Sequence, residues 1–100
     1  MSRPGEGFAS FKRSARFDAT YKGLESSLQK QVDKAVALLF ANRWHPGLKV
    51  HPVKPDKYYW EAYANSGDRI IYVPDGDCLL LVDIIPHDRI GRYGKRPRER

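Results

Sequence analysis

The strongest constraint on the fold is a helical stripe of apolar residues that gives way, halfway along the chain, to alternation with a period of two. The residues of the stripe are spaced by four, four, three and four positions: Leu24, Leu28, Val32, Ala35 and Leu39. Such spacing places them on one helix face, and it predicts helical structure over residues 18–42. Gly23 is expected to divide a short helix from a long one, and a capping box at Ser26–Gln29 to start the long helix. Asn42 and Pro46–Gly47 supply its end.

From Leu48 onward the pattern is that of β-strands. Strands are predicted at 48–53, 58–64, 69–73 and 79–85, with a further short strand within 8–17. Pro52 marks the first of the later strands as an edge strand, because proline cannot donate a ladder hydrogen bond. The almost wholly apolar run at 79–85 is typical of a strand buried on both faces. The order predicts an α+β fold: a small antiparallel sheet, made of the N-terminal strand and the C-terminal meander, with a pair of helices packed on one face.

The chain of 100 residues is long enough for one domain. Its ends differ in composition from its middle, which predicts a flexible N-terminus at 1–7, a compact unit at 8–93 and a basic disordered tail at 94–100. The net charge is +6, and the excess of lysine and arginine lies in residues 1–16 and 87–100. Basic ends attract polyanions, of which nucleic acid is the commonest. A tail that only improves solubility is the alternative reading.

Several classes of protein are excluded by composition. The single cysteine, Cys78, can form neither an internal disulfide nor a cysteine-based zinc site. The longest apolar stretch, at 78–85, is interrupted by Asp83 and is far shorter than the roughly 20 residues of a membrane span. No secretory signal precedes the domain, so a cytoplasmic location is expected. The three histidines lack metal-ligand spacing, and neither a metal nor another cofactor is expected.

Three segments carry a resemblance to a known family: HPGL at 45–48, WEAYANSGDRIIY at 60–72 and LVDIIPHD at 81–88. In this order and spacing they resemble the RelE/ParE toxin superfamily of bacterial toxin–antitoxin systems, over about residues 11–93. The resemblance implies a RelE-like toxin that is held silent by a cognate antitoxin. Members of the RelE branch cut mRNA in the ribosomal A site and so inhibit translation, whereas members of the ParE branch block DNA gyrase.

Metal-free RNA cleavage needs groups that move protons and groups that hold the phosphate. Histidine titrates near neutrality, and arginine pairs with phosphate oxygens. We therefore expect His87, Arg69 and Arg89 to be catalytic, at the end of the last strand and the start of its hairpin partner. Residues expected to bind RNA are basic or aromatic: Lys49, His51, Lys54, Tyr63 and Tyr93. The structural alternatives are a cap at His87–Asp88 and a cross-strand pair of Arg69 with Glu61.

The leading hypothesis is thus a RelE-like toxin that is a metal-independent mRNA endoribonuclease, with mRNA on the ribosome and an antitoxin as its partners. A ParE-like toxin that inhibits gyrase without catalysis is the first alternative. It is favoured by Tyr63, which stands where ribonucleases of the family commonly carry an arginine. A basic RNA-binding domain without activity or antitoxin is the second alternative.

Overall fold

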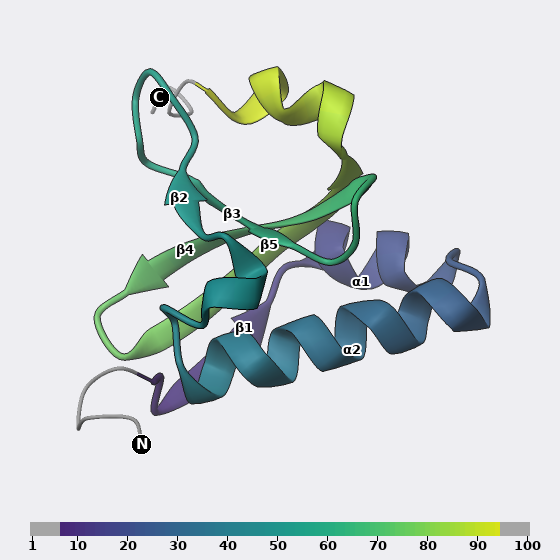
Figure 1. The fold of residues 1–100 in the computed structure, drawn as a ribbon, viewed down its shortest axis with the longest axis horizontal. Helices are drawn as coiled ribbons and strands as arrows, with labels where there is room; N and C mark the ends of the chain where they lie inside the picture. The colour runs from purple at the N-terminus through teal and green to yellow at the C-terminus, as the bar shows by residue number, and fades with distance from the viewer. Residues whose placement is uncertain (1–6, 95–100) are drawn as a thin grey trace.

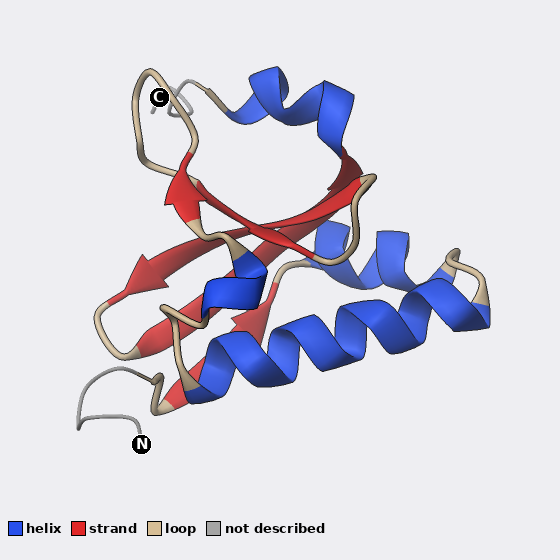
Figure 2. Ribbon diagram, viewed as in Figure 1, coloured by secondary structure: helices blue, strands red, loops and turns tan. Residues whose placement is uncertain are grey.

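A computed structural model describes residues 7–94 of the chain; the expected flexible N-terminus up to residue 6 and the basic tail from residue 95 lie outside it. The elements are β1 (Ser10–Arg13), α1 (Ala15–Lys22), α2 (Ser26–Ala41), β2 (His51–Pro52), β3 (Trp60–Tyr63), β4 (Asp68–Asp75) and β5 (Cys78–Pro86), with 3-10 helices η1 (Pro46–Leu48) and η2 (His87–Tyr93). The five strands form one sheet in the order β1-β5-β4-β3-β2 (Figures 1 and 2). In the described part of the chain, no helix is both long and apolar enough to cross a membrane.

The helix pair follows the sequence pattern closely. Gly23 ends α1, and Asn42 is the C-cap of α2, as predicted. The buried residues of α2 belong to the apolar stripe: Val32, Ala35 and Leu39. The predicted capping box was wrong, because Glu25 is the N-cap and makes no side-chain capping bond. The Gln29 amide instead donates to the carbonyl oxygen of Tyr21 at 2.8 Å and so ties α2 to α1.

The sheet confirms the α+β class but is mixed rather than wholly antiparallel. β3, β4 and β5 form an antiparallel meander, whereas β1 pairs with β5 in parallel. The physical reason is that the chain crosses one sheet face as α1 and α2 before the meander begins, so β1 meets only the last strand. β5 therefore pairs with a strand along each of its edges. Its two faces contribute to the two cores, Ile84 to one and Ile85 to the other, in agreement with its apolar sequence. The predicted strand at 48–53 shrinks to β2, because Leu48 lies in η1 and Lys49 is left-handed with φ of 50°.

The sheet is covered unequally on its two faces. α1 and α2 pack on one face over the larger core, which includes Ala62, Ile70 and Tyr72. η2 and the loop 53–59 stand over the other face, where a smaller core joins Val53, Ile71, Ile85 and Tyr93 (Figure 1). This second face is only partly covered, and it leaves room for polar side chains of β2, β3 and β4.

Gly94 fixes η2 against the loop 53–59. It is buried, its carbonyl oxygen accepts from the amide of Asp56 at 2.9 Å, and a Cβ atom there would lie 2.6 Å from the carbonyl oxygen of Lys54. We expect Gly94→Ala to lower the free energy of unfolding by about 1–3 kcal/mol, because the backbone must shift to admit the methyl group. Gly91→Ala is the matched control, since a Cβ at Gly91 would meet nothing within 4 Å. Equal unfolding midpoints of the two variants in urea would contradict this packing.

Tyr93 joins η2 to the sheet through a buried carboxylate. Its hydroxyl donates to Asp83 Oδ2 at 2.6 Å, and Asp83 Oδ1 accepts from the Thr20 hydroxyl at 3.2 Å. Burial, together with this bond to Asp83, raises the pKa of Tyr93 to about 12. The nearby cations Arg16 and Arg92 act in the opposite direction.

These contacts predict how Tyr93→Phe changes stability with pH. At pH 7 the variant should unfold about 1–3 kcal/mol more easily, because Asp83 loses a donor. The pKa of Tyr93 is raised from 10.0 to about 12 on folding, so its contribution is complete below pH 10 and is lost as pH rises through 12. Denaturation at several pH values should therefore show the gap between wild type and variant narrowing over this window. If the difference in the free energy of unfolding stays constant between pH 10 and 12, ionisation of Tyr93 does not contribute to it.

Candidate functional site

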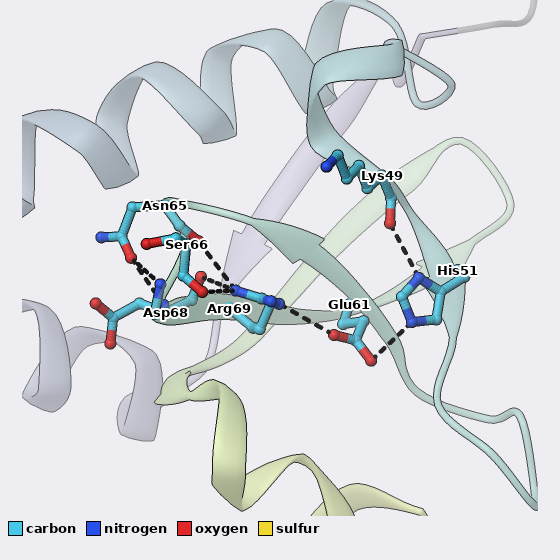
Figure 3. A network of polar contacts seen from close by, with 8 residues as sticks. Lys49, His51, Glu61, Asn65, Ser66, Asp68 and Arg69 are labelled. Atoms are coloured by element: carbon cyan, nitrogen blue, oxygen red, sulfur yellow. Dashed lines mark hydrogen bonds and ion pairs between the residues drawn. The ribbon is translucent and has the colours of Figure 1, made fainter.

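The polar residues of the partly covered sheet face come from three neighbouring strands. Side chains alternate along β3, so Trp60 and Ala62 pack in the helix-side core while Glu61 and Tyr63 face the other way. Directly opposite Glu61 in the register is His51 of β2, and directly opposite Tyr63 is Arg69 of β4. Figure 3 shows these contacts: Glu61 lies between His51 and Arg69, with Lys49 next to His51.

Glu61 is a buried carboxylate that holds an exposed imidazole. Its residue surface is 5% exposed, whereas the His51 side chain is 54% exposed. His51 Nε2 lies 3.0 Å from Glu61 Oε2, and His51 Nδ1 lies 3.0 Å from the carbonyl oxygen of Lys49. Both partners are acceptors when Glu61 is ionised, so both bonds form when each ring nitrogen carries a proton. The ring is thus fixed in orientation and stays open to a ligand.

Arg69 supports Glu61 from the buried side. Its Nε lies 3.4 Å from Glu61 Oε1, within ion-pair range but without the alignment of a hydrogen bond. Its Nη1 donates to the carbonyl oxygens of Asn65, Ser66 and Asp68 at 2.9–3.2 Å. Arg69 is 3% exposed, which leaves it no free surface for the phosphate contact expected from the sequence. The alternative cross-strand pair of Arg69 with Glu61 is present.

Two cations lie near the ring of Tyr63. The Arg69 guanidinium carbon lies 3.6 Å from its ring centroid, and Lys49 Nζ lies 4.9 Å from it. Tyr63 remains partly exposed. A cation over an aromatic ring is attracted by the negative ring face, so these contacts keep Lys49 close to His51. The exposed Lys49 ammonium thus lies at the same corner of the sheet as the exposed His51 imidazole.

His87 and Arg89 come from η2, which follows β5, and two strands, β4 and β3, separate β5 from β2 and His51. The His87 amide donates to the carbonyl oxygen of Gly67 at 2.8 Å, within the turn whose carbonyls hold Arg69. His87 and Arg89 are exposed, as is Lys54 on the loop 53–59. The turn at 65–68 thus contacts both the Arg69 side chain and the start of η2.

Tyr93 takes a different place from the one expected. It is 9% exposed, bonded to Asp83 and packed edge-on against Tyr59 at 4.9 Å between ring centroids. A stacking role needs an exposed ring face, which this position does not offer. Glu61 is the residue that sequence reasoning missed as part of the site. Its signal was a charge at a position of β3 between apolar neighbours that pack in the core. Within residues 7–94, no group of three His, Cys, Asp or Glu side chains is arranged to hold a metal ion.

Comparison with known proteins relates this arrangement to one group of solved structures. No family model matches the chain, and no curated protein does. The YoeB/ParE toxin from Agrobacterium tumefaciens is 14% identical, with a TM-score of 0.65 over 78% of this chain and 98% of that one. YafQ from E. coli is 16% identical, with a TM-score of 0.67 over 80% and 94% of the two chains. The RelB–RelE antitoxin–toxin complex from Methanococcus jannaschii contains a chain that is 15% identical, with a TM-score of 0.61 over 85% and 98%.

The chain has the RelE/ParE toxin fold. The resemblance inferred from residues 45–88 is confirmed at the level of the fold, and the likeness covers nearly the whole length of each of these toxins. At 14–16% identity, this likeness concerns the path of the backbone and not the side chains of the site. The chemistry of the site therefore follows from this chain's own residues.

Proposed function

We propose that the protein is the toxin of a type II toxin–antitoxin system, and that it acts in the cytoplasm as a metal-independent endoribonuclease on ribosome-bound mRNA. The observation that carries the proposal is the exposed His51 imidazole, held by the buried Glu61 carboxylate next to the exposed Lys49 ammonium. The fold supports the same class, since similar structures include YafQ and RelE, solved with the antitoxins DinJ and RelB.

The reaction that suits these groups is attack by a ribose 2′-oxygen on the adjacent phosphorus. The 2′-hydroxyl gives up its proton to a base as the new phosphorus–oxygen bond forms. The bond to the 5′-oxygen breaks, and that oxygen takes a proton from an acid. The products are a 2′,3′-cyclic phosphate and a 5′-hydroxyl, and the proton count balances. Two titratable groups are needed, and the exposed histidines among residues 7–94, His51 and His87, are the candidates.

The roles follow from burial and position. We assign His51 the role of acid: Glu61 keeps its bond to Nε2, and the Nδ1–H exchanges the Lys49 carbonyl oxygen for the leaving 5′-oxygen, to which it gives its proton. We assign His87 the role of base. Lys49, Lys54 and Arg89 are exposed cations that hold the phosphate and stabilise its developing charge. We assign buried Arg69 a positioning role, through Glu61 and the turn at 65–68, in place of direct phosphate contact.

The antitoxin has a suitable docking place on the opposite side of the molecule. A cavity of about 680 Å³ lies between β1, α1 and α2, and its apolar lining includes Phe11, Val36 and Phe40. Phe11 is 49% exposed and packs edge-on against Phe40 at 5.9 Å between ring centroids. We place an amphipathic segment of the antitoxin in this groove, because one apolar face of a helix would cover these side chains.

Induced expression tests the proposed function. Growth of the host should stop, and mapping of mRNA 5′ ends should reveal new ends inside translated reading frames. Co-expression of the protein encoded by an adjacent small reading frame should restore growth and yield a stable complex on gel filtration. Growth arrest without new mRNA ends would reject the ribonuclease activity.

His87→Gln should remove toxicity while leaving the fold and RNA affinity nearly intact. The imidazole is exposed and only the backbone amide of His87 contacts Gly67, so glutamine keeps the structural contact. General acid–base groups contribute roughly 10²–10⁴-fold to a rate, and that is the expected loss of cleavage. Growth and thermal midpoint should be measured together. A variant of normal stability that is fully toxic would remove His87 from the mechanism.

Inhibition of DNA gyrase is the second candidate. It is favoured by the burial of Arg69 and by Tyr63 at the place expected for an arginine, because the phosphate then has fewer guanidinium partners. Purified protein should in that case inhibit supercoiling by gyrase, and variants at His51 and His87 should remain toxic. Inhibition of supercoiling by wild type and by both variants would favour this candidate over RNA cleavage.

A further inference from the structure

A second cavity lies on the helix side of the sheet, on the opposite face from His51 and Glu61. It has a volume of about 330 Å³ and lies between the end of α2, β3 and the β4–β5 hairpin. Its lining is mostly aromatic: Phe8, Trp44, Trp60 and Tyr72, with Arg43 and Pro74 beside them. The two tryptophans of the chain thus line the same cavity. Phe8 and Tyr72 also belong to the larger core, and the catalytic proposal does not use the cavity.

Trp44 is the exposed wall of this aromatic pocket. It is 54% exposed, and its ring packs edge-on against Trp60 at 5.8 Å between centroids. Trp60 in turn lies 6.4 Å from Tyr72, which is buried. A large ring held in contact with a second ring, next to open volume, offers a face on which a third planar group can stack. The size of the pocket fits one side chain and not an extended ligand.

Arg43 supplies the polar group of the pocket. Its guanidinium carbon lies 3.9 Å from the centroid of the Phe8 ring, and Nη2 donates to the carbonyl oxygen of Gly7 at 2.9 Å. Its Nε is buried and has no hydrogen-bond partner. Arg43 as a whole is partly exposed and lines the cavity, so its guanidinium can meet an acceptor that a ligand brings. Because the donor is charged, a carboxylate is the best acceptor.

The hairpin next to the pocket excludes a phosphate chain. Asp75 and Asp77 flank Gly76, which lines the cavity, and both are exposed. Among residues 7–94, Arg43 is the one cation that lines the cavity. One cation and two neighbouring carboxylates suit a single anionic group on an otherwise apolar ligand, and they repel a continuous polyanion. The chemistry is that of an aromatic side chain with a neighbouring carboxylate, as a peptide can present it.

The pocket adjoins the groove in which we placed the antitoxin. The Phe8 amide donates to the carbonyl oxygen of Phe40 at 2.8 Å, so a wall of the pocket and a wall of the groove share one backbone contact. Arg43 and Trp44 follow Phe40 by three and four residues. A peptide that leaves the groove at Phe40 can therefore continue directly into the pocket. We propose that this pocket binds an aromatic side chain of the antitoxin together with an adjacent carboxylate. The identity of the partner rests on the proposed function, whereas the ligand chemistry does not.

Tryptophan fluorescence of the isolated protein tests the chemistry. Phenylacetate should bind saturably with Kd of about 1 mM, the affinity expected of a ligand of this size. Phenylacetamide, which has the ring without the charge, and acetate, which has the charge without the ring, should bind about tenfold more weakly. Arg43→Gln should abolish the preference for phenylacetate over phenylacetamide, while Lys30→Gln, which removes a charge from exposed α2 surface, should keep it. Equal affinities for the three probes, or tighter binding of adenosine monophosphate, would overturn the proposal.

Affinity for the antitoxin tests the partner. Trp44→Ala should keep the fold, because the side chain is exposed, and should weaken the complex about 30-fold, as expected of an interface anchor. In a Trp60→Phe background, Trp44 fluorescence should become protected from acrylamide when the complex forms. An unchanged affinity of Trp44→Ala would overturn the proposal even if phenylacetate binds. If wild type forms no complex at all, the proposed function fails, and binding of phenylacetate then still supports the ligand chemistry.

Discussion

Replacing His51 by glutamine should lower the rate of mRNA cleavage by roughly 10²–10⁴-fold and leave the protein as stable as wild type. The side chain is 54% exposed, so its loss removes little packing. What it removes is a proton donor whose ring is fixed by Glu61 at 3.0 Å and by the Lys49 carbonyl oxygen at 3.0 Å. Glutamine can donate one hydrogen bond to Glu61 but cannot transfer a proton. Cleavage of ribosome-bound mRNA and the thermal midpoint should be measured on the same preparation.

His45→Asn is the matched control for His51→Gln. His45 caps η1 by accepting from the amide of Gly47 at 3.1 Å, and asparagine can cap in the same way. This variant should cleave mRNA at the wild-type rate. If His51→Gln cleaves as fast as His45→Asn, the imidazole of His51 takes no part in the reaction, and the role of Glu61 is structural.

Replacing Arg69 by methionine should produce the largest loss of stability of any single change considered, about 3–5 kcal/mol. The change leaves the buried Glu61 carboxylate with His51 as its remaining partner and frees the carbonyl oxygens of the turn at 65–68. For a domain of this size, each 1 kcal/mol lowers the unfolding temperature by roughly 4–8 °C. The double variant Glu61→Leu with Arg69→Met should recover much of the loss, because it removes both buried charges. Urea denaturation of the singles and the double measures the coupling.

Arg13→Met provides the comparison. Arg13 Nε lies 3.0 Å from Asp18 Oδ1, a shorter contact than that of Arg69 with Glu61, but the two side chains are 54% and 44% exposed. An exposed pair contributes little in water, so a loss below about 1 kcal/mol is expected. A similar loss for Arg13→Met and Arg69→Met would mean that burial does not determine the importance of Arg69.

The local structure of the chain could be predicted from the sequence where one strong pattern decided it. The apolar stripe of α2 and the stop at Asn42 depend on neighbours within a few residues, and both were predicted. The apolar run of β5 likewise indicated a strand covered on both faces. The capping box failed because Glu25 rather than Ser26 is the N-cap, and helix ends are decided by competition among adjacent polar residues.

The site depended on contacts that no local pattern contains. Alternation along β3 places Glu61 on the face opposite Trp60, but only the register of β2 against β3 puts His51 directly across from it. The register of β3 against β4 likewise stacks Arg69 on Tyr63 and buries it, which turned an expected phosphate ligand into a support for Glu61. The parallel pairing of β1 with β5 was decided in the same way, by where two distant segments meet. Sequence determined which residues were chemically able to act, because side-chain chemistry is local. Tertiary structure decided which of them are exposed and which face one another, because burial and strand register arise only when distant segments pack.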